Sequence, residues 1–205
     1  METMEYVRKY EAEMVETRRK IHQHPELSNQ EFDTTKLVKE RLAEYGIEIA
    51  EIGMSTGCVG IIRGGKSGKT LALREDMDAL AMPELSGVSF ASDNPNKNHA
   101  CGHDIHTAIL LFCAKILSEI KEELSGNIML LFQPAEENGT GARELVSCKF
   151  NEVLRPDAFL GVHVAPEVTA GYIGLKKGPA SASVDVFSIR ITGLGGHGAR
   201  PYDCI

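Results

Sequence analysis

The sequence has no long hydrophobic run and no excess of positive charge. No stretch approaches the roughly 18 consecutive apolar residues of a membrane span, and residues 1–14 are charged where a signal peptide would be apolar. The chain has 22 Lys and Arg residues against 29 Asp and Glu residues, a net charge of −7. This balance argues against a nucleic-acid-binding module, which neutralises phosphates with basic side chains. We therefore expect a cytoplasmic protein that binds neither nucleic acid nor membrane.

Cysteines are few and widely spaced. There are five, at positions 58, 101, 113, 148 and 204, an odd number without the close spacing of a disulfide-stabilised secreted domain. A special cysteine in this chain is therefore expected to be a metal ligand or a nucleophile. The 205 residues, of which 42% are hydrophobic and 25% charged, suffice for one domain core, or for one domain plus a further piece.

Hydrophobic periodicity predicts helices that alternate with short strands. Residues 4–23 have helical spacing, and a second helix is expected to run from a capping box of Ser28 and Glu31 to a stop at Gly46. Further helices are expected at residues 107–124 and 137–146, and strands at residues 47–52, 58–62, 71–73, 128–132, 158–164 and 181–192. This alternation predicts an α/β fold in which helices cover a sheet.

A glycine-rich segment, residues 64–68, separates two of the predicted strands. We expect it to form the turn of a hairpin between them. The segment Gly68-Lys69-Thr70 also ends like a phosphate-binding loop, but that pattern requires a glycine five residues before Gly68, where this chain has Arg63. We therefore predict no nucleotide site there.

Carboxylates follow two of the predicted strands. The i, i+2 spacing of Asp76 and Asp78 directs both side chains to the same side of an extended backbone. Glu136 and Glu137 come directly after a buried apolar strand, where two charges are costly unless a cation or hydrogen bonds compensate them. Because adjacent side chains point in different directions, one glutamate can ligate a metal while the other reaches a bound water.

Thiol and imidazole groups gather in residues 99–106, and a further histidine, His163, follows another strand. Cys101 and His103 together suit Zn²⁺ and similar divalent ions. Ligands bind at the carboxyl ends of strands in open α/β sheets. We therefore expect these residues to converge with the carboxylates.

Each of these residues also has a structural explanation. The aspartates suit a turn or helix cap, and the glutamates suit a helix N-terminus. Cys101 suits a small core position, and His99 and His106 suit surface or helix-capping positions. A lone histidine at a strand end, such as His163, is usually structural. The presence of all four groups together favours a metal site over these separate explanations.

Five ordered motifs resemble those of a family of metal-dependent amidohydrolases that includes hippurate hydrolases, N-acyl-amino-acid hydrolases and plant auxin-conjugate hydrolases. They are ALREDMDAL at residues 72–80, HACGHD at 99–104, FQPAEE at 132–137, GVH at 161–163 and GGH at 195–197. The resemblance implies a metallopeptidase-like catalytic domain with three layers, helix, sheet and helix, at residues 1–178. Residues 179–205 would begin a small α/β lid domain, through which many members form homodimers.

The resemblance also implies roles for individual residues. Cys101, His103, Glu137 and His163 are expected to ligate a pair of divalent ions, either Zn²⁺ or Mn²⁺, with Co²⁺ or Ni²⁺ as further options. Glu136 is expected to act as the general base. The implied reaction is hydrolysis of the amide bond of an N-acyl amino acid by a metal-activated water, which yields a carboxylic acid and a free amino acid.

Three further residues match positions outside the ligand set. Asp78 is expected to orient a metal-ligating group. His197 resembles the lid histidine that, in several relatives, reaches the partner subunit's site and polarises the scissile carbonyl. Asp76 occupies a position where more distant relatives have a metal histidine.

Two alternatives remain open. The family's pattern continues beyond residue 205, where a further metal histidine is expected, so one alternative is a catalytically incompetent fragment that binds metal or associates with another chain. The other is a thiol-dependent enzyme that uses Cys101 with His103. The adjacent glutamates argue against it, because thiol hydrolysis needs no such pair.

Overall fold

Residues 3–204 of the chain are described by a computed structural model, which divides into two units between Ala165 and Pro166. The first unit contains a five-stranded sheet. In the second unit nearly all described residues are exposed, and their one regular element is the 3-10 helix η2 (Pro201–Asp203). The domain boundary at residue 178 and the lid at residues 179–205 stay predictions.

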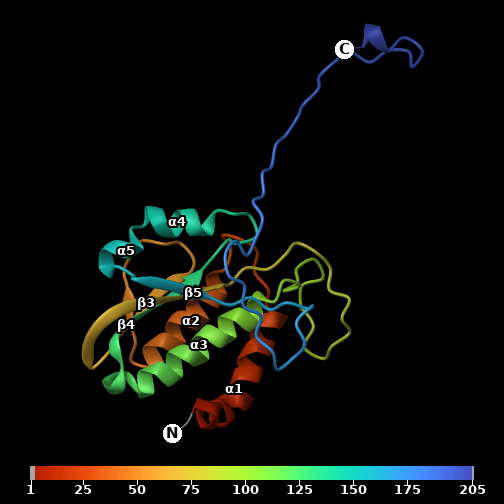
Figure 1. The fold of residues 1–205 in the computed structure, drawn as a ribbon. Coiled ribbons are helices and arrows are strands. Elements are labelled where there is room, and N and C mark those ends of the chain that lie inside the picture. Colours follow the sequence, from red (N-terminus) through yellow and green to blue (C-terminus); the bar gives the residue numbers. More distant parts are fainter. Residues whose placement is uncertain (1–2, 205) are drawn as a thin grey trace. The chain divides into compact units, whose positions relative to one another are not determined.

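Helices lie on both faces of the sheet in the first unit. The strands are β1 (Glu48–Ala50), β2 (Cys58–Arg63), β3 (Lys66–Asp76), β4 (Ser125–Gln133) and β5 (Ala158–Gly161). The helices are α1 (Thr3–Gln23), α2 (Phe32–Glu44), α3 (His103–Glu119), α4 (Gly141–Ser147) and α5 (Phe150–Val153), with the 3-10 helix η1 at Lys121–Glu123. Helices α1, α2 and α3 cover one face, and α4 and α5 cover the other (Figure 1). The predicted three-layer α/β arrangement is confirmed.

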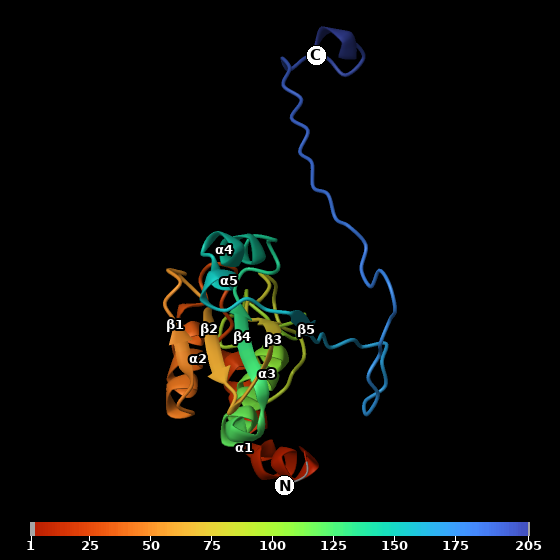
Figure 2. The ribbon, with the colours of Figure 1, turned by 60° about the vertical axis from the view of Figure 1, so that its left-hand side comes forward.

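The strand order brings the carboxyl ends of β3, β4 and β5 to the same end of the sheet. Figure 2 shows the strands side by side in the order β1, β2, β4, β3, β5. Strand β3 is parallel to both β4 and β5, while β2 is antiparallel to β4 and β1 is antiparallel to β2. Arg74 of β3 pairs with both Leu131 of β4 and Gly161 of β5. The segments that follow β3, β4 and β5 therefore leave the sheet together.

The hydrophobic core lies on both faces of β4. Leu130 and Phe132 belong to the cluster beneath α2 and α3, whereas Met129 and Leu131 belong to a second cluster with Leu145 of α4. These four side chains of β4 are all buried, which explains why this part of the strand is a continuous apolar run in the sequence. Burial of each such side chain stabilises the fold by about 1.5–3 kcal/mol.

The predicted hairpin is wrong. Strands β2 and β3 are joined by Gly64 and Gly65, but β4 lies between them and pairs with both. The glycines allow the connection to cross close to the start of β4. The Gly64 N–H donates to Gly126 O at 2.9 Å, and a Cβ at Gly64 would collide with that oxygen. The glycines thus serve close backbone approach rather than a hairpin turn.

The capping box at Ser28 and Glu31 is also wrong. Helix α2 begins at Phe32, and the Glu31 side chain makes no capping bond to it. Glu26 provides the cap instead, because its carboxylate accepts hydrogen bonds from the N–H groups of Asp33 (3.0 Å) and Thr34 (2.7 Å). Ser28 donates its hydroxyl to Asp78 at 2.6 Å, so both predicted capping residues face other segments.

Other boundaries also differ from the predictions: β3 spans residues 66–76 rather than 71–73, and α3 ends at residue 119 rather than 124. Helix α3 begins at residue 103, four residues before the predicted start, and β5 ends at residue 161 rather than 164. Helix α4 starts at residue 141, because residues 135–140 form a turn. The strand expected at 181–192 is wrong: among residues 166–204 the structure contains no strand, so the alternating side chains have no ladder partner.

Within residues 3–204, no helix has both the length and the apolar content required to cross a membrane.

Candidate metal centre

His103 is the residue on which the predicted site converges. It is the first residue of α3 and is fully buried. Its Nδ1 lies 3.3 Å from Oδ1 of Asp78, and its Nε2 lies 3.5 Å from Oδ1 of Asp76. The expectation that both aspartates point to one side of the β3 backbone is confirmed.

The glutamate pair approaches His103 from the end of β4. Oε1 of Glu137 lies 3.8 Å from His103 Nε2, and Oε2 of Glu136 lies 4.0 Å from it. The Glu137 side chain is 20% exposed and the Glu136 side chain is 43% exposed. The more accessible carboxylate therefore lies beside the more enclosed one, an arrangement that allows one to bind a cation and the other to exchange protons with solvent.

The start of α3 is fixed by a glycine. Gly102 has a φ of +88°, a left-handed conformation that favours glycine. A Cβ at this position would collide with the Val164 side chain. Gly102 thus allows the chain to turn from Cys101 into the helix while α3 packs closely against the segment after β5.

His163 follows β5 and is held by backbone bonds on both sides. The Val162 N–H donates to Oε1 of Glu75, and the Val164 N–H donates to Nε2 of His106, both at 2.9 Å. These bonds involve two buried side chains from β3 and α3. They hold the exposed imidazole of His163 within 3.5 Å of Cys101, measured from Nε2 to Sγ.

Three groups of potential ligands share His103, and in each group single donor atoms all lie within 4.8 Å of one another. The other members are Cys101 and His163 in the first group, Glu136 and Glu137 in the second, and Asp76 and His106 in the third. His103 Nε2 and Glu137 Oε1 are buried but have no hydrogen-bond partner. Because unpaired buried polar atoms are costly, these atoms fit a divalent cation with nitrogen, oxygen and sulfur ligands.

The thiol is not an activated nucleophile. Burial raises the pKa of Cys101 to about 12, and the negative charge of Glu137 contributes in the same direction. The thiol is therefore protonated at neutral pH in the metal-free chain, whereas a catalytic cysteine needs a thiolate. This argues against the thiol-dependent alternative.

The pKa values of two carboxylates beside His103 are shifted in opposite directions. Burial raises the pKa of Asp76, but the hydrogen bond from His106 and the charge of His103 outweigh it and hold this pKa at about 2. Burial likewise raises the pKa of Glu137, and in this case the net shift is upward. For His103, burial lowers the pKa, but the nearby Asp78 and Asp76 carboxylates reverse this effect and the net shift is upward.

Sequence reasoning gave His106 and His99 no specific role and offered surface or helix-capping positions as their structural explanation. Both are buried, with 0% and 4% exposure, so the surface and capping explanations are wrong. The Nδ1 atom of His106 lies 2.6 Å from Oδ1 of Asp76, whose other oxygen pairs with Arg74 at 2.7 Å. The signal was the i, i+3 spacing of His103 and His106, which places both imidazoles on one side of a helix that begins at residue 103.

His197 belongs to the second unit. Its Nδ1 accepts a hydrogen bond from the Ala199 N–H at 3.3 Å, and its carbonyl accepts one from the Arg200 N–H at 2.8 Å. These contacts form a local turn at the predicted lid motif. The role of His197 toward a substrate carbonyl stays a prediction.

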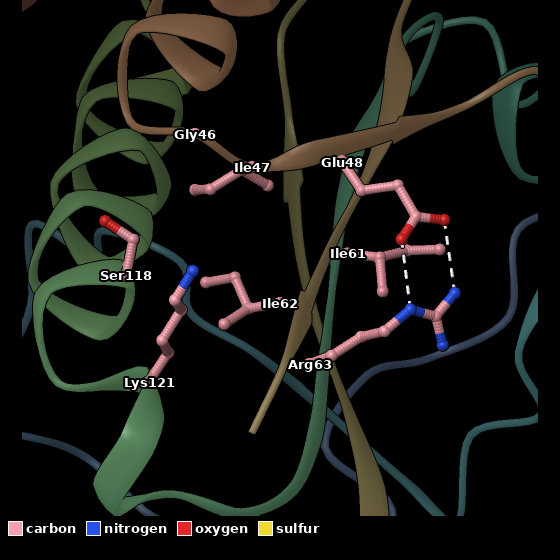
Figure 3. A pocket seen from close by; sticks show the side chains of 8 residues that line it. All are labelled: Gly46, Ile47, Glu48, Ile61, Ile62, Arg63, Ser118 and Lys121. Carbon is pink, nitrogen blue, oxygen red and sulfur yellow. Dashed lines mark hydrogen bonds and ion pairs between the residues drawn. The ribbon is translucent and has the colours of Figure 1, made fainter. Parts of the chain in front are cut away.

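A separate hollow lies at the end of the sheet opposite to the glutamates. It measures about 160 Å³ and is lined partly by β1, β2 and the end of α3 (Figure 3). Arg63, which lines it, pairs with Asn127 near the start of β4, whereas the glutamates follow the end of that strand. The hollow is therefore not part of the cluster around His103.

Comparison with known proteins assigns the chain to a family. A family model described as peptidase family M20/M25/M40 matches residues 72–202, which include every residue of the His103 cluster. The chain belongs to this family.

Relatives and solved structures agree with this M20 assignment. An N-acetyl-L-cysteine deacetylase of Bacillus subtilis is 44% identical over 193 residues, which cover 94% of this chain and 46% of that protein. Thermostable carboxypeptidase 2 of Saccharolobus solfataricus is 45% identical over 97% of this chain and 51% of its own length. The chain thus spans about half the length of these relatives.

The fold is shared with a solved M20 enzyme. The crystal structure of a dinuclear metal-binding peptidase of Bacillus subtilis matches with a TM-score of 0.80 at 38% identity, over 84% of this chain and 48% of that one. The α/β unit around His103 is therefore the fold of the M20 catalytic domain.

Proposed function

We propose that this M20 chain carries the metal-binding half of the active site of an amidohydrolase that acts on N-acyl amino acids. The observation that carries the proposal is that the buried Nε2 of His103 and the buried Oε1 of Glu137 lie 3.8 Å apart and neither has a hydrogen-bond partner. We assign Cys101, His103, Glu137 and His163 as ligands of two divalent ions, Zn²⁺ or Mn²⁺. Relatives named as N-acetyl-L-cysteine deacetylase and N-acyl-L-amino acid amidohydrolase support the substrate class.

The divalent ions would supply Lewis acidity, which lowers the pKa of bound water and polarises an amide carbonyl. Glu136 is the general base: its half-exposed carboxylate takes the proton of the attacking water and transfers it to the leaving amine. Asp78 holds the His103 ring through Nδ1 and directs Nε2 toward the glutamates. The products are a carboxylic acid and a free amino acid.

The remaining assignments extend this proposal beyond the His103 cluster. His197 would stabilise the developing oxyanion from a lid domain that begins in residues 179–205, and that lid would form a homodimer. The catalytic domain would extend to residue 178. Cytoplasmic location and the lack of nucleic-acid or membrane partners stay predictions from composition.

The test is hydrolysis of N-acetyl, N-benzoyl and indole-acetyl amino acids with added Mn²⁺ or Zn²⁺. We expect activity that a chelator abolishes and that Glu136→Gln lowers by roughly 10²–10⁴-fold, the usual contribution of a general base. Glu152→Gln, at an exposed glutamate of α5, is the matched control and should keep wild-type activity. Full activity in Glu136→Gln would refute the assigned base, and metal binding without hydrolysis would favour the fragment alternative.

A further inference from the structure

The backbone N–H groups of Ala135, Glu136 and Glu137 all donate hydrogen bonds to carboxylates from other segments. The Ala135 N–H donates to Oε1 of Glu31 at 2.8 Å. The Glu136 and Glu137 N–H groups donate to the two oxygens of Asp78, each at 3.0 Å. The turn that carries the glutamates is therefore held from two sides, by Asp78 after β3 and by Glu31 before α2.

Ala135 needs this support because of its backbone conformation. Its φ is +51°, in the left-handed region that costs a residue with a Cβ roughly 1–2 kcal/mol. The turn is closed on the other side by the Ala135 carbonyl, which accepts from the N–H groups of Thr140 (3.2 Å) and Gly141 (3.0 Å). Residue 135 thus sets the direction in which the chain leaves β4, and with it the positions of Glu136 and Glu137.

Among the described residues Glu31 has no cationic partner; besides the Ala135 N–H, its carboxylate contacts the backbone of Asn29 and Glu31 and the Thr56 side chain. Glu31 is fully buried, and its side chain makes no capping bond to α2, a role that Glu26 fills. Within residues 3–204 no Lys, Arg or His side chain forms an ion pair with it. A buried carboxylate without a cationic partner is costly, and the Ala135 N–H is the contact that links it to the turn carrying the glutamates.

We propose that Glu31 is a positioning residue for the metal centre: by binding the Ala135 N–H it fixes the turn that aims Glu137 and Glu136 at His103. This inference rests on the proposed function, because it assumes that Glu137 is a metal ligand. Asp78 contacts His103 directly, whereas Glu31 acts only through the backbone. Loss of Glu31 should therefore weaken metal binding without removing any ligand.

The test measures Zn²⁺ affinity by competition with a chromophoric chelator, together with the urea unfolding of each metal-free variant. Glu31→Met keeps the length of the side chain but removes the acceptor, and we expect Zn²⁺ to bind about 10–100-fold more weakly, the usual effect of losing an outer partner of a metal ligand. Glu31→Gln keeps an acceptor oxygen and should stay within about threefold of wild type.

Glu26→Ala is the matched control. It removes a glutamate from the same segment and destabilises α2 through the lost cap, but it leaves the Ala135 bond intact. We expect lower stability with wild-type Zn²⁺ affinity, which separates positioning from a general loss of stability. Wild-type affinity in folded Glu31→Met would overturn the inference while leaving the proposed function intact, whereas absence of Zn²⁺ binding by the wild-type chain would refute the proposed function itself.

A second measurement does not depend on whether Glu31→Met folds. Amide hydrogen exchange of Ala135 in the metal-free wild-type chain should be slowed to within about tenfold of Leu131 in the centre of β4, because both N–H groups are bonded and buried. Exchange of Ala135 at the rate of an exposed amide would show that Glu31 does not hold the turn, and would overturn the inference.

Discussion

The first turn of α3 separates two buried polar clusters that differ in how their charges are matched. His103 faces the cluster of Asp76, Asp78 and the glutamates, whereas the next residue, Asp104, faces a cluster near α1. In the α1 cluster the two ring nitrogens of His22 lie 2.8 Å from Asp104 Oδ2 and 3.0 Å from Glu84 Oε1. The Nε atom of Arg18 approaches the same Asp104 oxygen at 2.6 Å.

The difference indicates which cluster is built to bind an ion. The α1 cluster brings two basic side chains, His22 and Arg18, against two carboxylates, so its charges compensate one another. In the His103 cluster, Arg74 and His106 pair closely with Asp76, but Glu136 and Glu137 approach a basic nitrogen, His103 Nε2, only at 4.0 and 3.8 Å. Single donor atoms of these two glutamates and His103 lie within 4.8 Å of one another. We interpret the α1 cluster as an anchor for the start of α3, and the His103 cluster as a site whose charge is completed by metal.

Removal of one histidine from each cluster should give opposite results, and this is the largest expected effect. His103→Ala should weaken Zn²⁺ binding roughly 100-fold or more, because it removes a proposed ligand that all three groups of potential ligands share. His22→Ala should keep Zn²⁺ affinity but lower the free energy of unfolding by about 3 kcal/mol, since it breaks a buried pair. Chelator competition and urea unfolding measure the two quantities; a His22→Ala chain that loses Zn²⁺ but keeps its stability would break the distinction.

Zinc should stabilise the chain through the His103 cluster alone. At free Zn²⁺ of about 100 times its dissociation constant, we expect a gain of about 2.7 kcal/mol in unfolding free energy. Thermal denaturation with and without a chelator checks this. The gain should persist in His22→Ala and vanish in His103→Ala; an equal gain in both variants would place the ion elsewhere.

Stability and Zn²⁺ affinity should respond to pH in opposite directions. The hydrogen bond with Asp104 raises the pKa of His22, so the stability that protonated His22 contributes is present below about pH 6.5 and is lost as pH rises through its folded pKa. The raised pKa of His103 acts in the same direction in the metal-free chain.

We therefore expect the unfolding free energy of the metal-free chain to fall as the pH rises above about 6.5, and to fall less steeply in His22→Gln. Zn²⁺ affinity should rise over the same range, because Cys101 and His103 must lose protons to become ligands. Urea unfolding at several pH values, with parallel Zn²⁺ titrations, checks both trends. A metal-free chain that gains stability with pH over this range would contradict the assignment.

The smallest effect on stability is expected at the end of the sheet opposite to the His103 cluster. Arg63 forms a two-bond ion pair with Glu48, at 3.0 and 3.1 Å, beside the hollow at that end (Figure 3). Both side chains are about half exposed, so Arg63→Gln should cost about 0.2–1 kcal/mol and leave Zn²⁺ affinity unchanged. A change in affinity would show that the site extends across the sheet.

The sequence predicted which residues come together better than how they are held. Cys101, His103, Glu136, Glu137 and His163 were expected at one edge of an α/β sheet, and the structure brings them there because three parallel strands end at that edge. Strand β4 and the end of α2 were predictable from local sequence, because a continuous apolar run marks the strand and Gly46 marks the end of the helix.

The supporting bonds could not be predicted because each joins segments far apart in the chain. Glu31 was interpreted as a helix cap, and only the tertiary structure places it against Ala135. For His106 the sequence suggested no role beyond a surface or helix-capping position, and the helix was expected to begin after it, at residue 107. The hairpin failed because the glycines at 64–68 permit close backbone approach as well as a turn, and the choice depends on where β4 inserts.

The most direct test of the metal centre is a crystal of the chain grown with Zn²⁺ and measured at the zinc absorption edge. The account predicts an anomalous peak within about 2.0–2.3 Å of His103 Nε2, with Glu137 or Cys101 among the other ligands. No peak at His103, or a peak at the His22 cluster in its place, would contradict the account.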